Sequence, residues 1–438
     1  MSDATSYPSI PFDILKWSDH PESNPLVEYV GMLICEGDEK RYQKLRPTIK
    51  NVILNLYACW LRSPDMYVAY SRDKNHYSKG KRYNKLFIKY EKLVSVVDRL
   101  AELDFIEHVA GFYDRGAGAG KRSRMRASSS LLPLFKGIEA IELSPPEDAE
   151  VIILKKGGQQ VDYKDTDATR EMRERLGIIN KTLKASKIEL DVSREELEAL
   201  QAESVARQLE GGDEDSRAFD LHSKTLVRIF NDKFTRGGRH YRGWWQVIPK
   251  QLRAKVLIDG EGVVELDYKS IHPNLLYIKE TGAPCPGDPY VLPGSEGDKL
   301  MRDVCKFALL VLINAKTLSE AKASIKREIR NKVAPEFHER LRAIDMDSVI
   351  ARLLERHEVI SRHFGAGAGL RLQKMDADIA DEIMSRLAAQ GVTCLPVFDS
   401  FLVKRSEVEK LRYAMDEVVN AKYACHIPVE TKNSLTTD

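Results

Sequence analysis

The sequence predicts an α+β protein in which amphipathic helices alternate with short strands along the chain. Apolar residues recur every three or four positions in several segments, which is the period of a helix with one buried face. Elsewhere, short β-branched and apolar runs end on aspartate, glycine or proline, as strands do. With 438 residues, the chain is long enough for two or three domains with cores of their own.

The composition is that of an ordinary soluble protein, with 43% hydrophobic and 31% charged residues and a net charge of +2. No apolar run approaches the length needed to span a bilayer, and the N-terminus lacks the features of a secretory signal. Six cysteines are scattered without a Cys-x-x-Cys pair, which argues against a zinc site or a disulfide framework. We therefore expect a cytoplasmic protein without a membrane partner.

Three segments are strongly basic although the chain as a whole is nearly neutral. Residues 71–92 contain eight Lys or Arg against two acids, and residues 115–126 contain five against none. Residues 228–255 contain eight against the single acid Asp232. Such clusters indicate contacts with nucleic-acid phosphates, although a basic run can also be a solvated face.

The N-terminal part predicts a core-facing helix over 47–62 and an amphipathic helix over 84–103. A strand over 105–113 follows, then a glycine-rich tip at 116–120 and a basic run over 121–126. The pattern is thus a helix followed by a two-stranded hairpin whose tip is rich in glycine and arginine.

This pattern resembles a winged helix-turn-helix over roughly residues 45–140. The resemblance implies a DNA-binding domain over 1–145, in which the helix enters the major groove and the wing contacts phosphates. Arg122, Arg124 and Arg126 are the candidate wing contacts. The alternative is a small α+β domain with a loop.

Residues 146–220 predict a charged helical connector. A helix over 166–187 carries apolar residues on one face, and a second helix begins at the capping box over 193–196. The acidic run over 210–215 predicts an exposed loop, and we expect the main domain boundary near it. The third domain then spans 221–438.

The third domain begins with a basic and aromatic segment over 230–241, followed closely by Trp244 and Trp245. Arginines beside aromatic residues suit stacking on bases and pairing with phosphates. A hairpin with buried tryptophans is the alternative for the Trp pair. Arg239, Tyr241 and Arg242 are the candidate nucleic-acid contacts.

Two predicted strands deliver aspartates to their ends. The apolar run over 263–266 ends on Asp267, and the run over 392–398 ends on Asp399 before a turn and a second strand. Two such carboxylates could hold two divalent cations about 3.5–4 Å apart, the arrangement used for in-line displacement at phosphorus. Between them, Arg302 and Lys306 lie four apart on a predicted helix and so share one face, which suits a triphosphate.

The order of these motifs resembles the palm and fingers of right-hand polymerases, nearest to the DNA polymerase I type (family A). Residues 267–272 (Asp-Tyr-Lys-Ser-Ile-His) resemble motif A, and Arg302 with Lys306 resembles motif B. The helix over 373–379 ends in the Ala-Asp-Ile of that family. Residues 397–400 (Val-Phe-Asp-Ser) resemble motif C, closer to the His-Asp-Ser form of single-subunit phage RNA polymerases. The resemblance implies an antiparallel palm sheet with flanking helices and small fingers.

The sequence departs from the family at three positions. His272 stands where family A has a glutamate and family B a tyrosine near the sugar, so the choice between deoxyribose and ribose stays open. Phe398 replaces the histidine of motif C, and Ser400 replaces the following glutamate. Nothing in the chain resembles a proofreading exonuclease.

The resemblance implies that Asp267 and Asp399 are catalytic and bind two Mg²⁺ ions, with Mn²⁺ as the alternative. Lys306 would contact phosphates and protonate the leaving pyrophosphate. The other implied contacts to the nucleotide are Arg302, His272 and Tyr268, and those to nucleic acid are Arg239, Tyr241, Arg242 and Gln373.

The sequence therefore predicts a template-dependent nucleotidyltransferase, foremost a DNA polymerase of a plasmid, phage or mobile element. Its expected partners are template and primer DNA, a duplex site, nucleoside triphosphates and other replication proteins. RNA polymerase or primase activity, the kind of template and the need for a primer stay open. The alternatives are a two-metal nuclease of RNase H-like fold and a non-catalytic winged-helix initiator or regulator.

Overall fold

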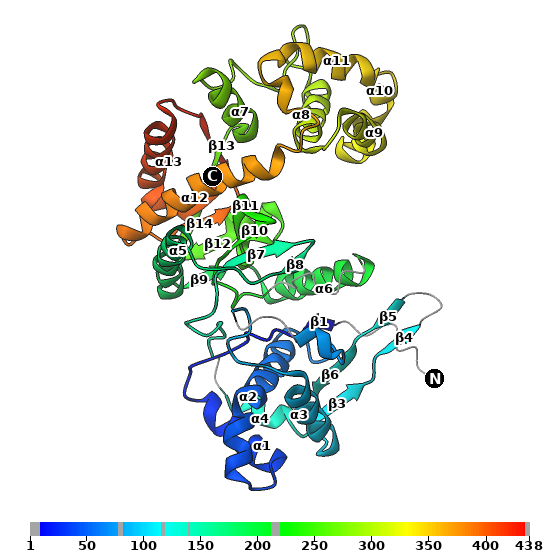
Figure 1. The fold of residues 1–438 in the computed structure, drawn as a ribbon, viewed down its shortest axis with the longest axis vertical. Coiled ribbons are helices and arrows are strands. Elements are labelled where there is room, and N and C mark those ends of the chain that lie inside the picture. Colours follow the sequence, from blue (N-terminus) through cyan, green and yellow to red (C-terminus); the bar gives the residue numbers. More distant parts are fainter. Residues whose placement is uncertain (1–8, 78–81, 115–118, 139–140, 212–219, 434–438) are drawn as a thin grey trace.

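Two separate hydrophobic cores organise the computed structural model, which describes residues 9–77, 82–114, 119–138, 141–211 and 220–433. The first core runs from Ile10 to Leu143, and the second from Ile152 to Ile427. Figure 1 shows the first unit at one end of the elongated molecule and a group of helices at the other, with the sheets between them. The fold is α+β, as the sequence predicts.

The N-terminal unit packs helices against a four-stranded sheet of order β1-β2-β6-β3, and a separate hairpin, β4–β5, extends from it. Its elements are β1 (Ser9–Pro11), α1 (Ser23–Ile34), α2 (Glu39–Arg62), β2 (Tyr67–Tyr70), η1 (Lys74–Tyr77), α3 (Tyr90–Glu102), β3 (Ile106–Val109), β4 (Phe112–Asp114), β5 (Ala119–Lys121), β6 (Ser123–Ala127) and α4 (Leu132–Lys136). The predicted glycine-rich tip at 116–120 lies largely outside the described residues.

Two helix starts in this unit differ from the prediction. Helix α2 begins at Glu39 because the Asp38 side chain accepts a hydrogen bond from the backbone N–H of Arg41 and caps it. Helix α3 begins at Tyr90 rather than near residue 84. The Asn84 side chain bonds both the N–H and the carbonyl of Ile88, and this holds the preceding segment in a loop.

The segment 146–220 is not a connector, and this prediction needs correction. Strand β7 (Ile152–Lys156) pairs in parallel with β10 (Val227–Asn231), and β9 (Ile188–Leu190) pairs with β12 (Val256–Ile258). The predicted apolar face of α5 (Asp167–Ala185) is buried in the second core. The boundary between the cores therefore lies between residues 143 and 152, and not near 210. The segment looked like a linker because its charges occupy the solvent faces.

The remaining elements of this part are β8 (Gln159–Gln160), α6 (Arg194–Gly211), β11 (Lys233–Tyr241), η2 (Trp244–Gln246) and η3 (Lys250–Lys255). The predicted capping box at the start of α6 is confirmed, since Ser193 and Glu196 bond each other's backbone N–H. A four-stranded sheet of order β11-β10-β7-β8 results, in which the β10–β7 pair is parallel rather than antiparallel.

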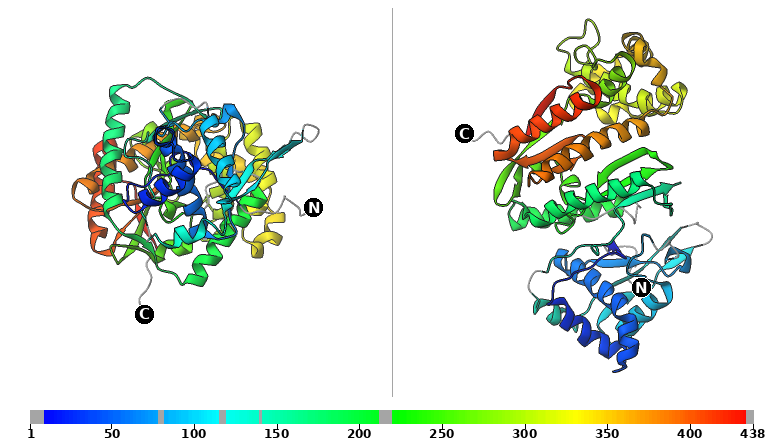
Figure 2. Two further views of the ribbon diagram at one scale, coloured as in Figure 1. Left: turned by 90° about the horizontal axis from the view of Figure 1, so that it is seen from below. Right: turned by 60° about the vertical axis from the view of Figure 1, so that its left-hand side comes forward.

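A second sheet, antiparallel throughout, has the order β14-β15-β13-β12-β9. A sixth strand, β16, also pairs with β13, along Glu265–Tyr268 at its C-terminal end. The further elements of this part are β13 (Glu261–Tyr268), β14 (Leu395–Val397), β15 (Ser400–Lys404), η7 (Arg405–Glu407), α13 (Val408–Tyr423) and β16 (Val429–Asn433). Helix α12 (Gly369–Ala389) packs along β11 and beside α13, as both Figure 1 and Figure 2 show. The Ser406 hydroxyl, just before α13, donates to Glu261 and does not cap the helix.

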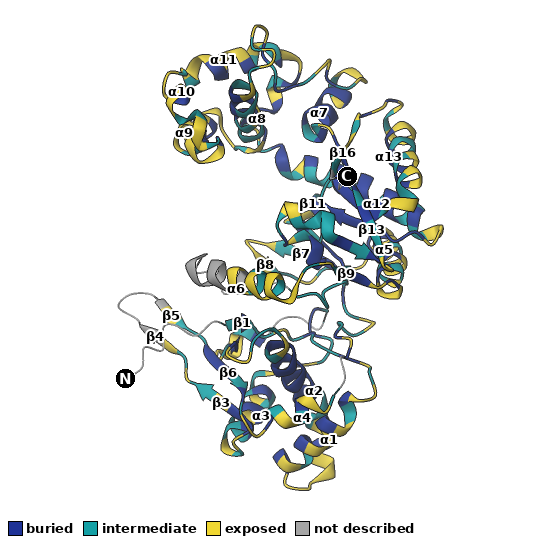
Figure 3. Ribbon diagram, turned by 180° about the vertical axis from the view of Figure 1, so that it is seen from behind, coloured by how far each residue is buried: buried dark blue, intermediate teal, exposed yellow. Residues whose placement is uncertain are grey.

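Between β13 and α12 the chain forms a helical group, which stands at the far end of the molecule from the N-terminal unit. It contains α7 (Ile271–Thr281), α8 (Lys299–Asn314), α9 (Leu318–Glu328), η4 (Ile329–Lys332), η5 (Pro335–Phe337), α10 (His338–Arg342), α11 (Met346–Arg356) and η6 (Glu358–His363). Figure 3 shows that exposed residues dominate α9–α11, whereas buried ones dominate β13 and α12. No helix among the described residues combines the length and apolar character that crossing a bilayer requires.

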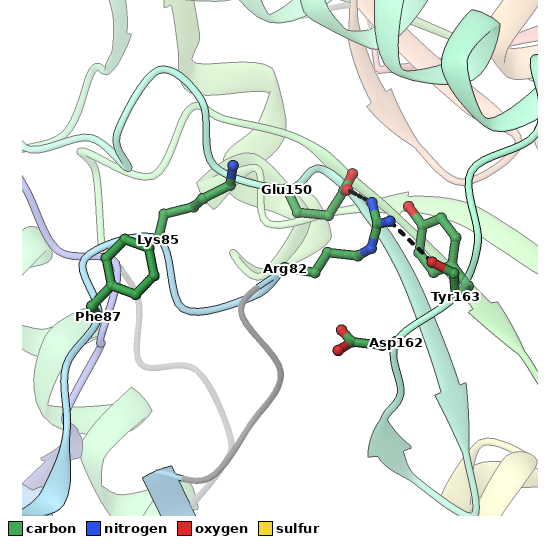
Figure 4. A pocket seen from close by; sticks show the side chains of 6 residues that line it. All are labelled: Arg82, Lys85, Phe87, Glu150, Asp162 and Tyr163. Carbon is green, nitrogen blue, oxygen red and sulfur yellow. Dashed lines mark hydrogen bonds and ion pairs between the residues drawn. The ribbon is translucent and has the colours of Figure 1, made fainter.

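Ion pairs join the two units. Arg82 of the first unit donates to Glu150 at 2.6 Å and to the carbonyl of Tyr163 at 3.0 Å, as Figure 4 shows. The same residues, with Lys85, Phe87 and Asp162, line a cavity of about 450 Å³. Burial and the bonds from Arg173 and Arg82 act against each other on Glu150, and its pKa is held below its usual value. The cavity walls are thus fixed mainly by charges that already have partners.

Candidate active site

Asp267 lies at the end of β13, flanked on both sides by other strands. In the register of the sheet it faces Ser400 of β15 on one side and Glu430 of β16 on the other. Its side chain is buried and forms an ion pair with Lys432 through Oδ2. Oδ1 has no hydrogen-bond partner among the described residues. A buried carboxylate oxygen without a partner is costly, and it therefore marks a place for a ligand.

Asp399 lies beside Asp267, in the two-residue turn that joins β14 to β15. The turn is closed by the pairing of Val397 with Ser400, so the residue opposite Asp267 directly follows Asp399. Phe398, the first turn residue, adopts φ +61°, which is strained for a bulky side chain. Ser270, three residues after Asp267, is also left-handed at φ +51°. Strained backbone of this kind concentrates at functional sites.

The charges of the two aspartates act on each other. Burial and the nearby charge of Asp399 raise the pKa of Asp267 to about 6, although Lys432 acts in the opposite direction. The charge of Glu430 adds to the repulsion. The site therefore has an excess of negative charge that one lysine does not offset, which is the condition under which a cation binds.

Glu265, two residues before Asp267 on the same face of β13, fixes the hairpin that carries Asp399. It is 1% exposed and accepts hydrogen bonds from the Ser400 hydroxyl at 2.8 Å and from Arg253 Nε at 3.0 Å. Because Arg253 supplies the opposite charge, Glu265 is a satisfied structural carboxylate.

Helix α8 places its predicted cationic pair beside the ring of Tyr290. The Arg302 guanidinium lies 5.6 Å and the Lys306 ammonium 5.9 Å from the centre of the Tyr290 ring. Burial raises the pKa of Tyr290, against a hydrogen bond with the Ser270 side chain, and the charge of Asp399 also contributes. Tyr290 therefore connects α8 with the end of β13. Arg302 also donates to Asp288 at 2.8 Å.

His272 belongs to a second cluster next to the carboxylates. Its Nε2 lies 2.7 Å from Oδ2 of Asp376 on α12, and Arg239 of β11 donates to both oxygens of the same carboxylate at 3.1 Å. The Arg239 guanidinium also lies 5.1 Å from the ring centre of Phe398. Although burial lowers the pKa of Arg239, Asp376 and the charge of Asp399 leave it raised. This cluster ties β11, α7 and α12 to the turn that carries Asp399.

Other predicted contacts are placed differently. Tyr268 is 2% exposed, and its hydroxyl donates to the backbone carbonyl of Met415 at 2.6 Å, so its side chain is a core residue and cannot hold a nucleotide. Trp244 and Trp245 are buried, which confirms the structural alternative for that pair. Tyr241 packs edge-on against Phe398 at 5.9 Å between ring centres.

Arg242 and Gln373 are half-buried, on the turn after β11 and on the first turns of α12. In the N-terminal unit, the three predicted wing arginines do not share one environment. Arg124 is 6% exposed, whereas Arg126 pairs with Glu107 at 2.8 Å and with Asp65 at 3.2 Å. Arg122 is half-buried just before β6.

The side chains at this site supply only some of the ligands that a divalent cation needs. No group of three or more His, Cys, Asp or Glu side chains placed to hold a metal occurs in the described part of the chain. Mg²⁺, however, is commonly held by one or two carboxylates, with substrate phosphates and water completing its shell. Asp267 and Asp399 supply that number, and the unpartnered Oδ1 of Asp267 is a suitable hard ligand.

Sequence reasoning missed Tyr290, Glu430 and Lys432, and it gave Asp376 no role. The alternation of Val429 and Thr431 was a weak signal for a strand. Nothing in the local sequence, however, indicates that this strand pairs with β13, which lies far away along the chain.

Comparisons with known proteins add little to this geometry. No protein-family model and no curated protein matches the chain. Among solved structures it is similar to the POL domain of Pol1 from M. smegmatis, in complex with a DNA primer-template and dNTP, at 14% identity and a TM-score of 0.28. The match covers 54% of this chain and 51% of that chain, so it spans about half of the solved structure. A likeness at this level carries no argument about activity.

Proposed function

We propose that this chain is a template-dependent nucleotidyltransferase, with DNA polymerase activity as the first candidate. The observation that carries the proposal is the pair Asp267 and Asp399. The sheet register brings them together, and one buried carboxylate oxygen there lacks a partner. Helix α8, with Arg302 and Lys306, reaches the same place through Tyr290. An RNase H-like nuclease would need the two carboxylates but not this cationic helix.

In the proposed reaction, Asp267 and Asp399 would hold the divalent cations. When bound, such ions would lower the pKa of a primer 3′-hydroxyl and neutralise the charge of the triphosphate. Arg302 and Lys306 bind the phosphates, and the exposed ammonium of Lys306 donates a proton to the departing pyrophosphate. Tyr290 holds the side chains of Arg302 and Lys306 at a fixed place relative to the carboxylates.

The Arg239–Asp376–His272 cluster forms the neighbouring wall of the site. Because Arg239 is paired with Asp376 and lies against Phe398, it positions the turn of Asp399. His272 lies five residues after Asp267, and we place it beside the sugar of the incoming nucleotide. Tyr241 and Gln373 remain candidates for contact with the template or the primer.

The N-terminal unit would bind duplex DNA as a winged helix. In support, a strand, a helix and a two-stranded hairpin follow in the order β2, α3, β3 and β6, and the three strands pair in the order β2-β6-β3. Arg124 is buried in the sheet and Arg126 is paired with Glu107 and Asp65.

Primer extension on a labelled primed template tests the proposal. Wild-type protein with Mg²⁺ or Mn²⁺ and either dNTPs or NTPs is expected to extend the primer. Asp267→Asn and Asp399→Asn should each lower the rate by roughly 10³-fold or more, since each removes a charge that acts on the transition state. Asp416→Asn is the matched control, because this half-exposed carboxylate is paired with His426.

The outcomes separate the candidate functions. Shortening of the labelled strand by the wild type, lost in Asp267→Asn, would show a nuclease. Absence of both extension and degradation under every condition would overturn the enzymatic proposal and leave the DNA-binding one.

A further inference from the structure

A β-bulge brings Lys432 to Asp267. In the ladder between β13 and β16, Tyr268 pairs with Val429, Asp267 with Glu430 and Leu266 with Thr431, but Glu265 pairs with Asn433. Lys432 is therefore the extra residue, without a partner in the ladder. A bulge bends its strand and redirects the side chain of the extra residue, and bulges are frequent beside active sites.

The redirected side chain of Lys432 ends at the buried carboxylate of Asp267. Lys432 forms an ion pair with Oδ2 of Asp267, while Oδ1 has no partner among the described residues. The Lys432 side chain is 26% exposed and that of Asp267 is 9% exposed, so the lysine is the more accessible of the two. Because Lys432 has no partner in the ladder, its side chain can leave Asp267 without breaking a strand pair.

Two further acids lie beside Asp267. Glu430 is its partner in the ladder with β16, and Asp399 directly precedes Ser400, the partner of Asp267 in the ladder with β15. No other cation is paired with Asp267 in the described part of the chain. Lys269, which also lies nearby, is exposed and faces Glu430 at 3.8 Å.

We propose that Lys432 is a positioning residue that takes the place of a divalent cation at Asp267 and must leave Oδ2 before such a cation binds there. Between turnovers the lysine occupies Oδ2 of Asp267. It lowers the affinity of the site for free metal, so that tight binding requires the phosphates of a substrate as further ligands. This inference rests on the proposed function of the carboxylate pair.

Binding of Mn²⁺ to the full chain without nucleotide tests the proposal, with free Mn²⁺ measured by electron paramagnetic resonance at pH 8. Lys432→Met is expected to lower the dissociation constant by about tenfold, because the metal no longer competes with an ammonium. Lys432→Arg, which keeps the charge, should bind as the wild type does. Lys269→Met is the matched control and should change the constant by less than about twofold, since its charge is exposed.

The double variant Asp267→Asn/Lys432→Met should lose the gain, which locates the effect at Asp267. Thermal unfolding of each variant checks that it is folded, and Lys432→Gln serves as a second neutral variant. Unchanged or weaker Mn²⁺ binding in both neutral variants, or no binding by any variant, would overturn the proposal.

Failure of this inference is distinguishable from failure of the proposed function. A gain in Mn²⁺ affinity without any primer extension by the wild type would keep the role of Lys432 and remove the polymerase. Primer extension by the wild type without a gain in Mn²⁺ affinity in the neutral variants would keep the polymerase and remove the role of Lys432.

Discussion

Buried aspartates occur in two regions of this protein, and their surroundings differ. On helix α12, Asp381 is 2% exposed, with His240 Nε2 at 3.1 Å and Arg228 at 3.3 Å. At the end of β13, Asp267 is 6% exposed, but Lys432 is its one ion-pair partner in the described part of the chain, and one of its oxygens is unpartnered. The two aspartates are buried to nearly the same degree, but Asp381 has more positively charged or hydrogen-bonding partners than Asp267.

The pKa values of these two groups follow from that contrast. Burial raises the pKa of Asp381, but the hydrogen bond from His240 and the charge of Arg228 outweigh it and bring it to about 2. Burial and Asp399 bring that of Asp267 to about 6. An acid that the fold compensates fully is structural, whereas a buried acid left short of positive charge is available for a ligand. The difference singles out Asp267 as the candidate ligand-binding carboxylate without any motif.

The largest effect on stability is expected at the compensated acid. Asp381→Ala should lower the free energy of unfolding by about 3–5 kcal/mol, because Arg228, which is fully buried, then loses a partner. Urea denaturation followed by tryptophan fluorescence would measure the change. Glu382→Gln, a half-exposed neighbour on the same helix, is the control and should cost less than about 0.5 kcal/mol. Equal effects at the two positions would remove the contrast.

The opposite sign is expected at Asp267. Asp267→Asn should raise the free energy of unfolding by about 1–3 kcal/mol at pH 8 without divalent metal. The reason is that the pKa of Asp267 lies above its unfolded value even with the help of Lys432, so ionisation of this group opposes folding. Denaturation of the two proteins in a chelating buffer checks the sign. A destabilised variant would show that Lys432 compensates Asp267 after all.

The pH dependence of this difference follows from the same shift. Above about pH 6, Asp267 is ionised in the folded protein, and the penalty is complete. Between about pH 6 and 4, the folded state keeps a proton that the unfolded state has released, so the penalty falls. Below about pH 4, both states are protonated, and wild type and Asp267→Asn should have the same stability. A difference that stays constant from pH 8 to pH 4 would contradict the assignment.

How far the sequence could reveal this site depends on the range of the interactions. Strand β13 and the β14–β15 hairpin follow from local pattern, and the order of their aspartates indicated a shared site. The burial of Tyr268 also follows from alternation, since it lies on the same face of β13 as Leu266. The pairing of β16 with β13 and the bulge at Lys432 depend on a contact between distant segments, and local propensity contains no information about it.

The same reason explains the error over residues 146–220. The charged residues of α5 are solvent-facing, and its apolar stripe needed β7 and β10 to form a core. The charged composition of residues 146–220 reflects their solvent-exposed face, and it contains no information about the strands that pack against the buried face.

The smallest expected effect concerns Tyr290, which lies between the cationic side chains of α8 and the aspartates at the strand ends. The acids of α12 touch their cations directly, whereas Arg302 and Lys306 are held near Asp399 through Tyr290. Tyr290→Phe keeps the ring under both cations and removes the hydroxyl that bonds Ser270. Loss of one hydrogen bond of this kind is worth about 0.5–1.5 kcal/mol. We therefore expect the KM for nucleotide to rise by roughly two- to tenfold, since α8 is less firmly placed.

Steady-state primer extension would measure this change, with unfolding measured in parallel. Tyr413→Phe is the control, because that ring is 69% exposed on α13. A drop in stability with an unchanged KM would make Tyr290 an ordinary core residue. A raised KM at nearly unchanged stability would show that the strand-end site, unlike the acids of α12, receives its positive charge from a separate helix, whose position is a variable of the reaction.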